Sequence, residues 1–148
     1  MRKSTLLIAL LLFAAASTLH AQEIFDAVKA NDLSTVKRLI TKDLSLVNQK
    51  DNYDNTLLHI AADSGYVKIA EYLLGEGADI STKNAEGNTP LHLAALFGHV
   101  GVSELFIQNK ADLNAVNVQL YTPLHSAVFN GQDDLSRLCI EKGVDIER

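Results

Sequence analysis

The stretch TPLHLAALFG at residues 89–98 decides how this chain folds, because parts of it recur at a fixed spacing. The segments Thr56-Leu57-Leu58-His59, Thr89-Pro90-Leu91-His92 and Thr122-Pro123-Leu124-His125 each begin 33 residues apart. Self-similarity at a period of this size is typical of a stacked array of repeats. In such an array each unit buries its apolar face on its neighbours.

The similarity extends well beyond the tetrapeptide. Small residues, glycines and an Asp-containing segment follow it at constant offsets: Ala61-Ala62, Ala94-Ala95 and Ala127-Val128, then Gly65, Gly98 and Gly131, then residues 77–80, 110–113 and 143–146. Thr89 is suited to cap a helix, Pro90 to occupy its first turn, and Gly98 to end it in a left-handed conformation. Each unit therefore predicts a first helix after the Thr, and the apolar spacing of residues 69–74 predicts a second.

These residues closely resemble the ankyrin repeat family, whose T-P-L-H-x-A signature is intact at residues 89–94 and 122–127. The resemblance implies an all-α solenoid of about four helix-turn-helix repeats joined by β-hairpin loops, and a function in protein–protein recognition. The ankyrin repeat domain is placed at 22–148, with repeats at about 22–54, 55–87, 88–120 and 121–148. The first repeat is degenerate and suits a polar cap.

One departure from the repeat pattern bears on loop geometry. Leu120 stands where Gly87 occupies the preceding loop. Because leucine resists the left-handed conformation, we expect a distorted loop before Tyr121.

The first 21 residues have the order of a secretory signal peptide. Arg2 and Lys3 precede an apolar run over residues 6–16, which small and polar residues follow. The run is shorter than the roughly 20 residues of a bilayer span, so an uncleaved membrane anchor is the alternative. We expect cleavage after Ala21, with a cut near Ser17 as the alternative. The mature protein is then periplasmic or secreted, with a plan that is typical of a bacterial exported protein.

Charge and cysteine content narrow the function classes. The chain has 13 basic and 18 acidic residues, and removal of residues 1–21 takes away only Arg2 and Lys3, which leaves 11 against 18 and a formal charge of −7. This balance argues against nucleic acid and, once the leader is removed, against a membrane as partner. Cys139 is the one cysteine, so it forms no internal disulfide, and the repeat register places it in the core.

No catalytic, metal or cofactor site is predicted. His59, His92 and His125 occupy equivalent positions in packed helices about 8–10 Å apart, whereas zinc–nitrogen bonds are about 2 Å long. The ankyrin resemblance implies instead that these histidines hold their turns by hydrogen bonds to neighbouring backbone. Nucleophile-elbow, phosphate-loop, zinc-protease, dithiol and dinucleotide motifs are absent from the sequence. Asp133 and Asp134 are expected to stabilise a helix N-terminus rather than to act as paired carboxylates.

The candidate binding surface consists of apolar side chains at positions that are normally solvated. They lie at the ends of first helices and on the loops before them, and the set is Tyr53, Leu96, Phe97, Val118, Leu120, Tyr121 and Phe129. If contiguous, these side chains expose on the order of 500 Å², the size of a patch that monomers usually employ. Aromatic anchors are also frequent hot spots of interfaces. Coverage of the C-terminal end of the stack, or homodimer formation, is the alternative use.

The sequence therefore predicts a monomeric, exported scaffold that binds another protein and modulates or neutralises it. A structural or assembly subunit, or an accessory factor that supports an exported enzyme, is the alternative. An enzyme or cofactor carrier is the third class, and the lack of catalytic motifs argues against it.

Overall fold

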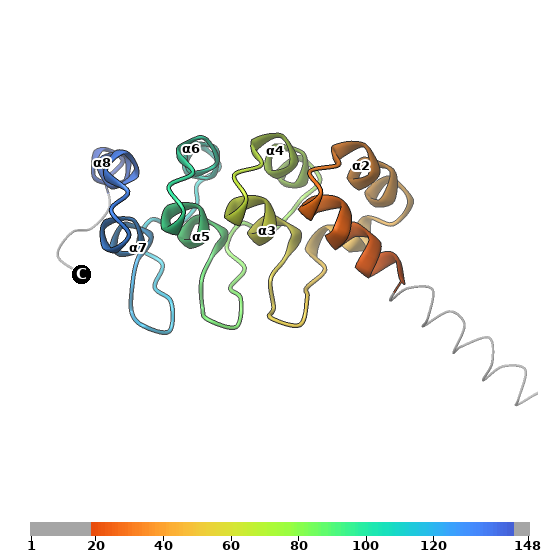
Figure 1. Cartoon of the computed structure of the whole chain (residues 1–148), viewed down its shortest axis with the longest axis horizontal. Coiled ribbons are helices and arrows are strands. Elements are labelled where there is room, and N and C mark those ends of the chain that lie inside the picture. The colour runs from red at the N-terminus through yellow and green to blue at the C-terminus, as the bar shows by residue number, and fades with distance from the viewer. Residues whose placement is uncertain (1–18, 144–148) are drawn as a thin grey trace, which may run out of the picture.

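The computed structural model describes residues 19–143 and arranges them as a row of helix pairs (Figure 1). Helical residues 19–29 and α2 (Leu33–Lys42) form the first unit, which the 3-10 helix η1 (Leu44–Asn48) follows. Three further pairs complete the row: α3 (Leu57–Asp63) with α4 (Val67–Gly75), α5 (Pro90–Leu96) with α6 (Val100–Gln108), and α7 (Pro123–Phe129) with α8 (Asp133–Glu141). The predicted all-α solenoid of stacked helix pairs is confirmed.

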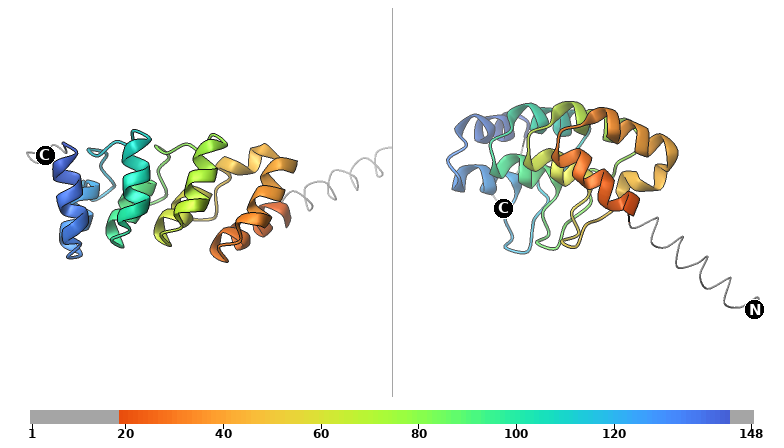
Figure 2. Two further views of the ribbon diagram at one scale, coloured as in Figure 1. Left: turned by 90° about the horizontal axis from the view of Figure 1, so that it is seen from above. Right: turned by 45° about the vertical axis from the view of Figure 1, so that its right-hand side comes forward.

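The helices after the first unit form two parallel rows. α3, α5 and α7 lie in one row, and α4, α6 and α8 lie in the other (Figures 1 and 2). Each helix contacts its own partner and the equivalent helix of the neighbouring repeat. The loops that precede α3, α5 and α7 all extend from the first row on the same side. These loops and first helices together build one face of the molecule, which we call the loop-side face.

The repeated motif sets the ends of each first helix. Thr89 precedes α5 in an extended conformation, and Pro90 occupies the first helical position, where a missing N–H costs no helical hydrogen bond. Gly98 follows the helix with φ of +72°, and the next N–H, that of His99, bonds back to the carbonyl of Ala94 at 2.9 Å. The motif residues therefore act as the sequence predicts.

The core lies between the two rows of helices. Small residues allow the first helices to approach one another closely, and Ala61, Ala94 and Ala127 are fully buried there. In the last repeat, Cys139 is fully buried beside Leu135, which confirms its predicted place in the core. Burial raises the pKa of the Cys139 thiol, which disfavours the reactive thiolate.

The connecting loops follow a hairpin path with little strand pairing. Among residues 19–143, the bridge between Lys50 and Thr56 is the one isolated antiparallel bridge. The prediction of a distorted loop before Tyr121 is wrong. Leu120 adopts a left-handed φ of +63°, close to the +75° of Gly87 at the equivalent position. The loop hydrogen bonds impose this conformation, which costs leucine roughly 1–2 kcal/mol.

Most of the predicted leader, residues 1–18, lies outside the described residues, as does the end of the last repeat motif at residues 144–146. Residues 19–21 belong to the helical segment that continues to residue 29. Across residues 19–143, no helix combines the length and apolar character that a bilayer span requires.

Candidate functional site

One side chain closes each loop of the loop-side face, and it recurs every 33 residues as Asp51, Asn84 and Asn117. The Oδ1 atom of Asn84 accepts hydrogen bonds from the N–H groups of Glu86 and Asn88, both at 3.0 Å. The other two loops are closed in the same way. Sequence reasoning missed these residues, although their spacing is the signal that would have found them.

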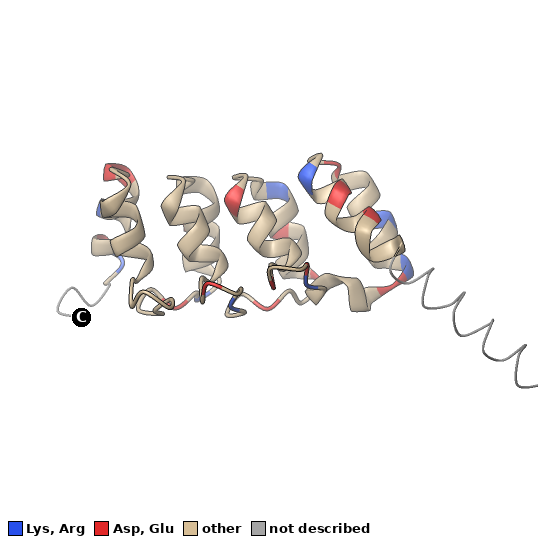
Figure 3. Cartoon of the chain, turned by 60° about the horizontal axis from the view of Figure 1, so that its bottom comes forward, with Lys and Arg blue, Asp and Glu red and all other residues tan. Residues whose placement is uncertain are grey.

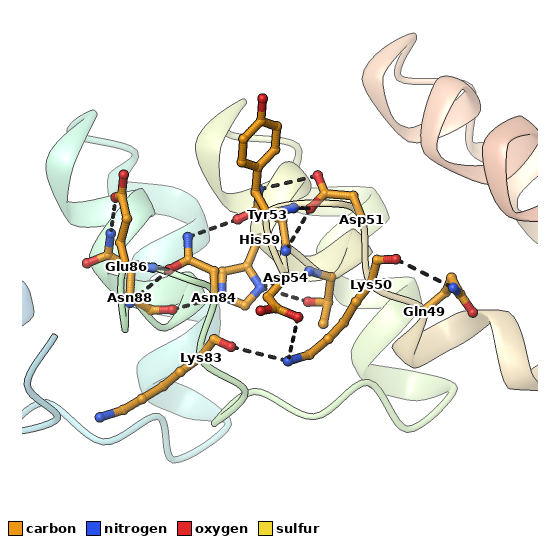
Figure 4. Close-up of polar contacts among 12 residues, drawn as sticks. Gln49, Lys50, Asp51, Tyr53, Asp54, His59, Lys83, Asn84, Glu86 and Asn88 are labelled. Carbon is orange, nitrogen blue, oxygen red and sulfur yellow. Dashed lines mark hydrogen bonds and ion pairs between the residues drawn. The ribbon is translucent and has the colours of Figure 1, made fainter. Parts of the chain in front are cut away.

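Adjacent loops are also held to one another. Asn84 donates through Nδ2 to Oδ1 of Asn55 at 2.9 Å, and the next pair of loops repeats this amide contact at 2.8 Å. Lys50 donates through Nζ to the carbonyl of Lys83 at 3.4 Å (Figure 4). Because each loop is fixed both internally and to its neighbour, the loops form a continuous, ordered surface along this face.

Two buried histidines fasten first helices to the following loops. Nδ1 of His92 accepts from the N–H of Thr89 at 3.1 Å, so the ring proton lies on Nε2, which donates to the carbonyl of Tyr121 at 2.9 Å. His59 makes the same contact with the carbonyl of Asn88 at 2.9 Å (Figure 4). Burial is the main cause that lowers the pKa of both rings, and the bond to the carbonyl offsets it in part. The hydrogen-bonding role expected of these two histidines is confirmed.

His125 differs from its two equivalents because the described residues include no loop after its repeat. Its ring is exposed and stacks on Tyr121 with centroids 5.9 Å apart and an angle of 17°. Its Nε2 atom contacts no acceptor among the described residues. Within that part of the chain, no group of three or more His, Cys, Asp or Glu side chains is arranged to hold a metal ion. Asp133 and Asp134 lie in the first turn of α8, where carboxylates favour a helix N-terminus.

The third and fourth repeats enclose an open groove of about 270 Å³, which we call the aromatic groove. Three of the predicted residues line it: Leu96, Tyr121 and Phe129. The rings of Tyr121 and Phe129 lie 6.3 Å apart, and Phe129 is 79% exposed. Leu96 is half-buried. The remaining lining residues are Glu86, Asn88, His92, Asn117, Gln119, Ser126 and Asn130.

A second groove, of about 220 Å³, lies between the second and third repeats, and we call it the acidic groove. Its lining includes one predicted residue, the exposed Tyr53, and the full set is Tyr53, Asn55, Asp63, Asn84, Ala85, Glu86 and Leu93. Glu86 lines both grooves, so they adjoin. The ion pairs among the described residues are Arg38 with Glu23 and Lys50 with Asp54, and neither involves Asp63 or Glu86.

The other three predicted residues line neither groove. The ring of Phe97 lies 6.3 Å from that of His99, and the N–H of Val118 donates to the carbonyl of Glu86 at 3.0 Å. Leu120 is 74% exposed on its loop. The structure therefore gathers Leu96, Tyr121 and Phe129 at one groove and disperses the rest of the predicted set.

Charge is distributed unevenly along the molecule. Residues 113–132 contain no charged side chain, and residues 87–109 contain only Glu104. Figure 3 shows the resulting scarcity of charge on α5 and α6, where Glu104 is the one charged residue, in contrast to the first unit, where both signs are present. The aromatic groove thus lies in a part of the molecule that is poor in charge, and Glu86 is the one charged residue of its lining.

Comparison with known proteins agrees with this architecture. The family model described as "Ankyrin repeats (3 copies)" matches residues 76–148, and the one described as "Ankyrin repeats (many copies)" matches residues 39–94. The chain is similar to Palmitoyltransferase AKR1 of Lachancea kluyveri (47% identity over 57 residues), to human Ankyrin repeat domain-containing protein 49 (41% over 54) and to human Protein phosphatase 1 regulatory subunit 27 (40% over 62). These alignments cover 38%, 36% and 42% of this chain but only 8%, 23% and 40% of the respective relatives.

The two family models together span residues 39–148, which include the α3–α8 helix pairs and both grooves. Ankyrin repeats typically serve as non-enzymatic scaffolds for protein–protein interaction. On the evidence of its repeats, its helix pairs and these matches, the chain belongs to the ankyrin repeat family.

Proposed function

We propose that this protein is a scaffold that holds one partner protein on its loop-side face, with the aromatic groove as the main anchor site. The observation that carries this proposal is the pair of exposed rings, Tyr121 and Phe129, beside the half-buried Leu96. Exposed aromatic side chains that cluster at a groove gain affinity when a partner removes them from water. The hydrogen-bonded loops also favour binding affinity, because a preordered surface loses little conformational entropy when a partner binds.

The partner is modulated or neutralised by being held, and the scaffold itself works as a monomer without a cofactor. An accessory factor for an enzyme is the second candidate, favoured by the similarity to a phosphatase regulatory subunit. The similarity to a palmitoyltransferase covers 8% of that protein, so it supports no enzymatic activity here.

We also propose that the scaffold acts after export, in a bacterial periplasm or outside the cell. The charged start and the apolar run over residues 6–16 support this location. Protein recovered from an exported fraction should begin at Gln22 on N-terminal sequencing. Recovery of intact Met1 in a membrane pellet would overturn export and support an uncleaved anchor.

Site-specific photo-cross-linking in the producing cell tests the binding surface. A cross-linking amino acid at Gln119, in the aromatic groove, should give a discrete adduct with one protein. The same group at Ile140, which is 55% exposed on α8, should give none. The reverse pattern would place the interface on the other row of helices.

Removal of the aromatic side chains should abolish that adduct. The triple variant Phe97→Ser, Tyr121→Ser, Phe129→Ser is expected to lose cross-linking from position 119 while its helical content and melting temperature stay close to those of the parent. The matched control replaces three exposed apolar residues elsewhere, Leu44, Val67 and Ile140, by Ser and should keep the adduct. Loss of fold in the triple variant would instead make its residues structural.

A further inference from the structure

We infer that the partner presents an extended segment in which a large apolar side chain and a basic side chain lie about three residues apart. This inference rests on the proposed function and specifies the chemistry of the partner. It is carried by the juxtaposition of the aromatic groove and the acidic groove, which meet at Glu86.

The aromatic groove fits the apolar side chain. Glu86, at its edge, is the one charged residue of its lining, and the rest of the lining is aromatic, aliphatic or uncharged polar. An apolar side chain that enters between Leu96, Tyr121 and Phe129 removes their surface from water without stripping water from a buried charge.

The acidic groove fits the basic side chain. The carboxylates of Asp63 and Glu86 both line it, and the ion pairs of the described residues involve neither group. Asp51 is nearby, but its Oδ1 atom already accepts the N–H groups that close its own loop. The carboxylate of Glu86 accepts one hydrogen bond, from the neutral Nδ2 of Asn88 at 3.0 Å, which leaves its charge unbalanced. Lys29 lines a further groove together with Asp63, so one nearby cation stands against two carboxylates and the excess is negative. A Lys or Arg from the partner would balance that excess.

Repeat geometry sets the spacing between the two side chains. The first helices of adjacent repeats pack about 8–10 Å apart, and each groove belongs to one pair of adjacent repeats. An extended chain advances about 3.3 Å per residue, so about three residues separate a side chain in one groove from a side chain in the next.

Selection from a display library of random dodecapeptides on the immobilised full chain tests the inference. Enriched peptides should contain Phe, Leu, Ile or Met together with Lys or Arg two to four residues away, in one consistent order. A synthetic consensus peptide should bind two- to five-fold more weakly for each carboxylate removed in Asp63→Asn and Glu86→Gln, as for other exposed ion pairs. Its affinity should also fall as salt rises.

Glu104→Gln is the matched control, because it removes one negative charge from α6, in the other row of helices. It should leave peptide affinity unchanged. Enrichment of apolar peptides without a basic residue, or an equal loss of affinity in the control, would overturn the inference while leaving the proposed binding surface intact. If the parent and the Phe97, Tyr121, Phe129 triple variant enrich the same peptides, the proposed function itself fails at this face.

Discussion

The imidazole of His92 donates through Nε2 to the carbonyl oxygen of Tyr121 at 2.9 Å, and this bond joins residues 29 positions apart in the chain. His59 and Asn88 are joined in the same way at the same separation. Each of these bonds links a first helix to the loop of the next repeat. His125 has no such acceptor among the described residues, which makes it an internal control of identical chemistry.

Replacement of His92 by Ala should therefore cost more stability than replacement of His125 by Ala. Removing the buried His92 ring leaves the N–H of Thr89 without its acceptor, and it leaves the carbonyl of Tyr121 with only the N–H of Asn117 at 3.0 Å as donor, for a loss on the order of 1–3 kcal/mol. The exposed His125 holds only its own turn, so its loss should be smaller. Urea denaturation of the two variants measures the difference, and equal losses would contradict the assigned role of the bond to the next repeat.

The free energy of unfolding should decrease as pH falls from 7.5 to 5.5. Burial lowers the pKa of His59 and His92 in the folded protein below the unfolded value of 6.5. Below pH 6.5 the unfolded chain thus binds more protons than the folded one, and stability is lost until pH reaches the lowered pKa. The dependence should be shallower in the His92→Ala variant. A stability that rises toward pH 5.5 would show that the folded rings are preferentially charged.

Leu120→Gly should raise the free energy of unfolding by about 0.5–1 kcal/mol. Leu120 has φ of +63°, a conformation that glycine adopts without strain. The greater conformational entropy of glycine in the unfolded chain offsets part of this stabilisation. Val118→Gly, two residues earlier and without a positive φ, should lower stability. A lower stability for Leu120→Gly would mean that the leucine side chain contributes more than its backbone strain costs.

The hydroxyl of Ser103 is the one buried side-chain oxygen without a hydrogen-bond partner among the described residues. Ala70 occupies the equivalent position one repeat earlier and is also fully buried. Ser103→Ala should therefore raise the free energy of unfolding by about 1 kcal/mol. Ser136→Ala, which removes a 2.8 Å bond to the carbonyl of Gln132, should give no such gain. Calorimetric melting of both variants provides the comparison.

Cys139 should react slowly with thiol reagents in the native protein and quickly in denaturant. The side chain is fully buried, and burial raises its pKa, so little thiolate is present at neutral pH. Rapid native labelling would show that α8 opens readily or that the thiol has a redox function.

The fold could be predicted because its determinants are local and repeated. Thr89, Pro90 and Gly98 each specify a backbone conformation by their own chemistry, and the 33-residue spacing shows that the unit recurs. At Leu120 the intrinsic preference of leucine predicts a distorted loop, but the loop hydrogen bonds outweigh that preference. The carboxamide of Asn117 accepts the N–H groups of Gln119 and Tyr121, and this fixes the loop whichever residue lies between them.

The candidate site could be predicted only in part. An unusual apolar residue is visible in the sequence, and Leu96, Tyr121 and Phe129 were found on that basis. Whether such residues meet is decided by the path of the loops, which places Val118 and Leu120 outside both grooves. The acidic groove could not be predicted because Asp63 and Glu86 look like ordinary surface residues in the sequence. Only the fold shows that both line the same groove.

The contacts of α7 and α8 within the described residues have a consequence for how readily this helix pair opens. Helices α3 to α6 have neighbouring repeats on both sides, whereas the contacts of α7 and α8 among the described residues come from their own pair and from α5 and α6. In a stack with nearest-neighbour contacts, such a unit opens more often than the interior, so amide hydrogen exchange should be faster in α7 than in α3. The aromatic groove draws Tyr121 and Phe129 from this labile unit. Occupation of the groove would thus slow amide hydrogen exchange in α7 and α8. Because these helices contact α5 and α6, it would also reduce the opening of the neighbouring repeat.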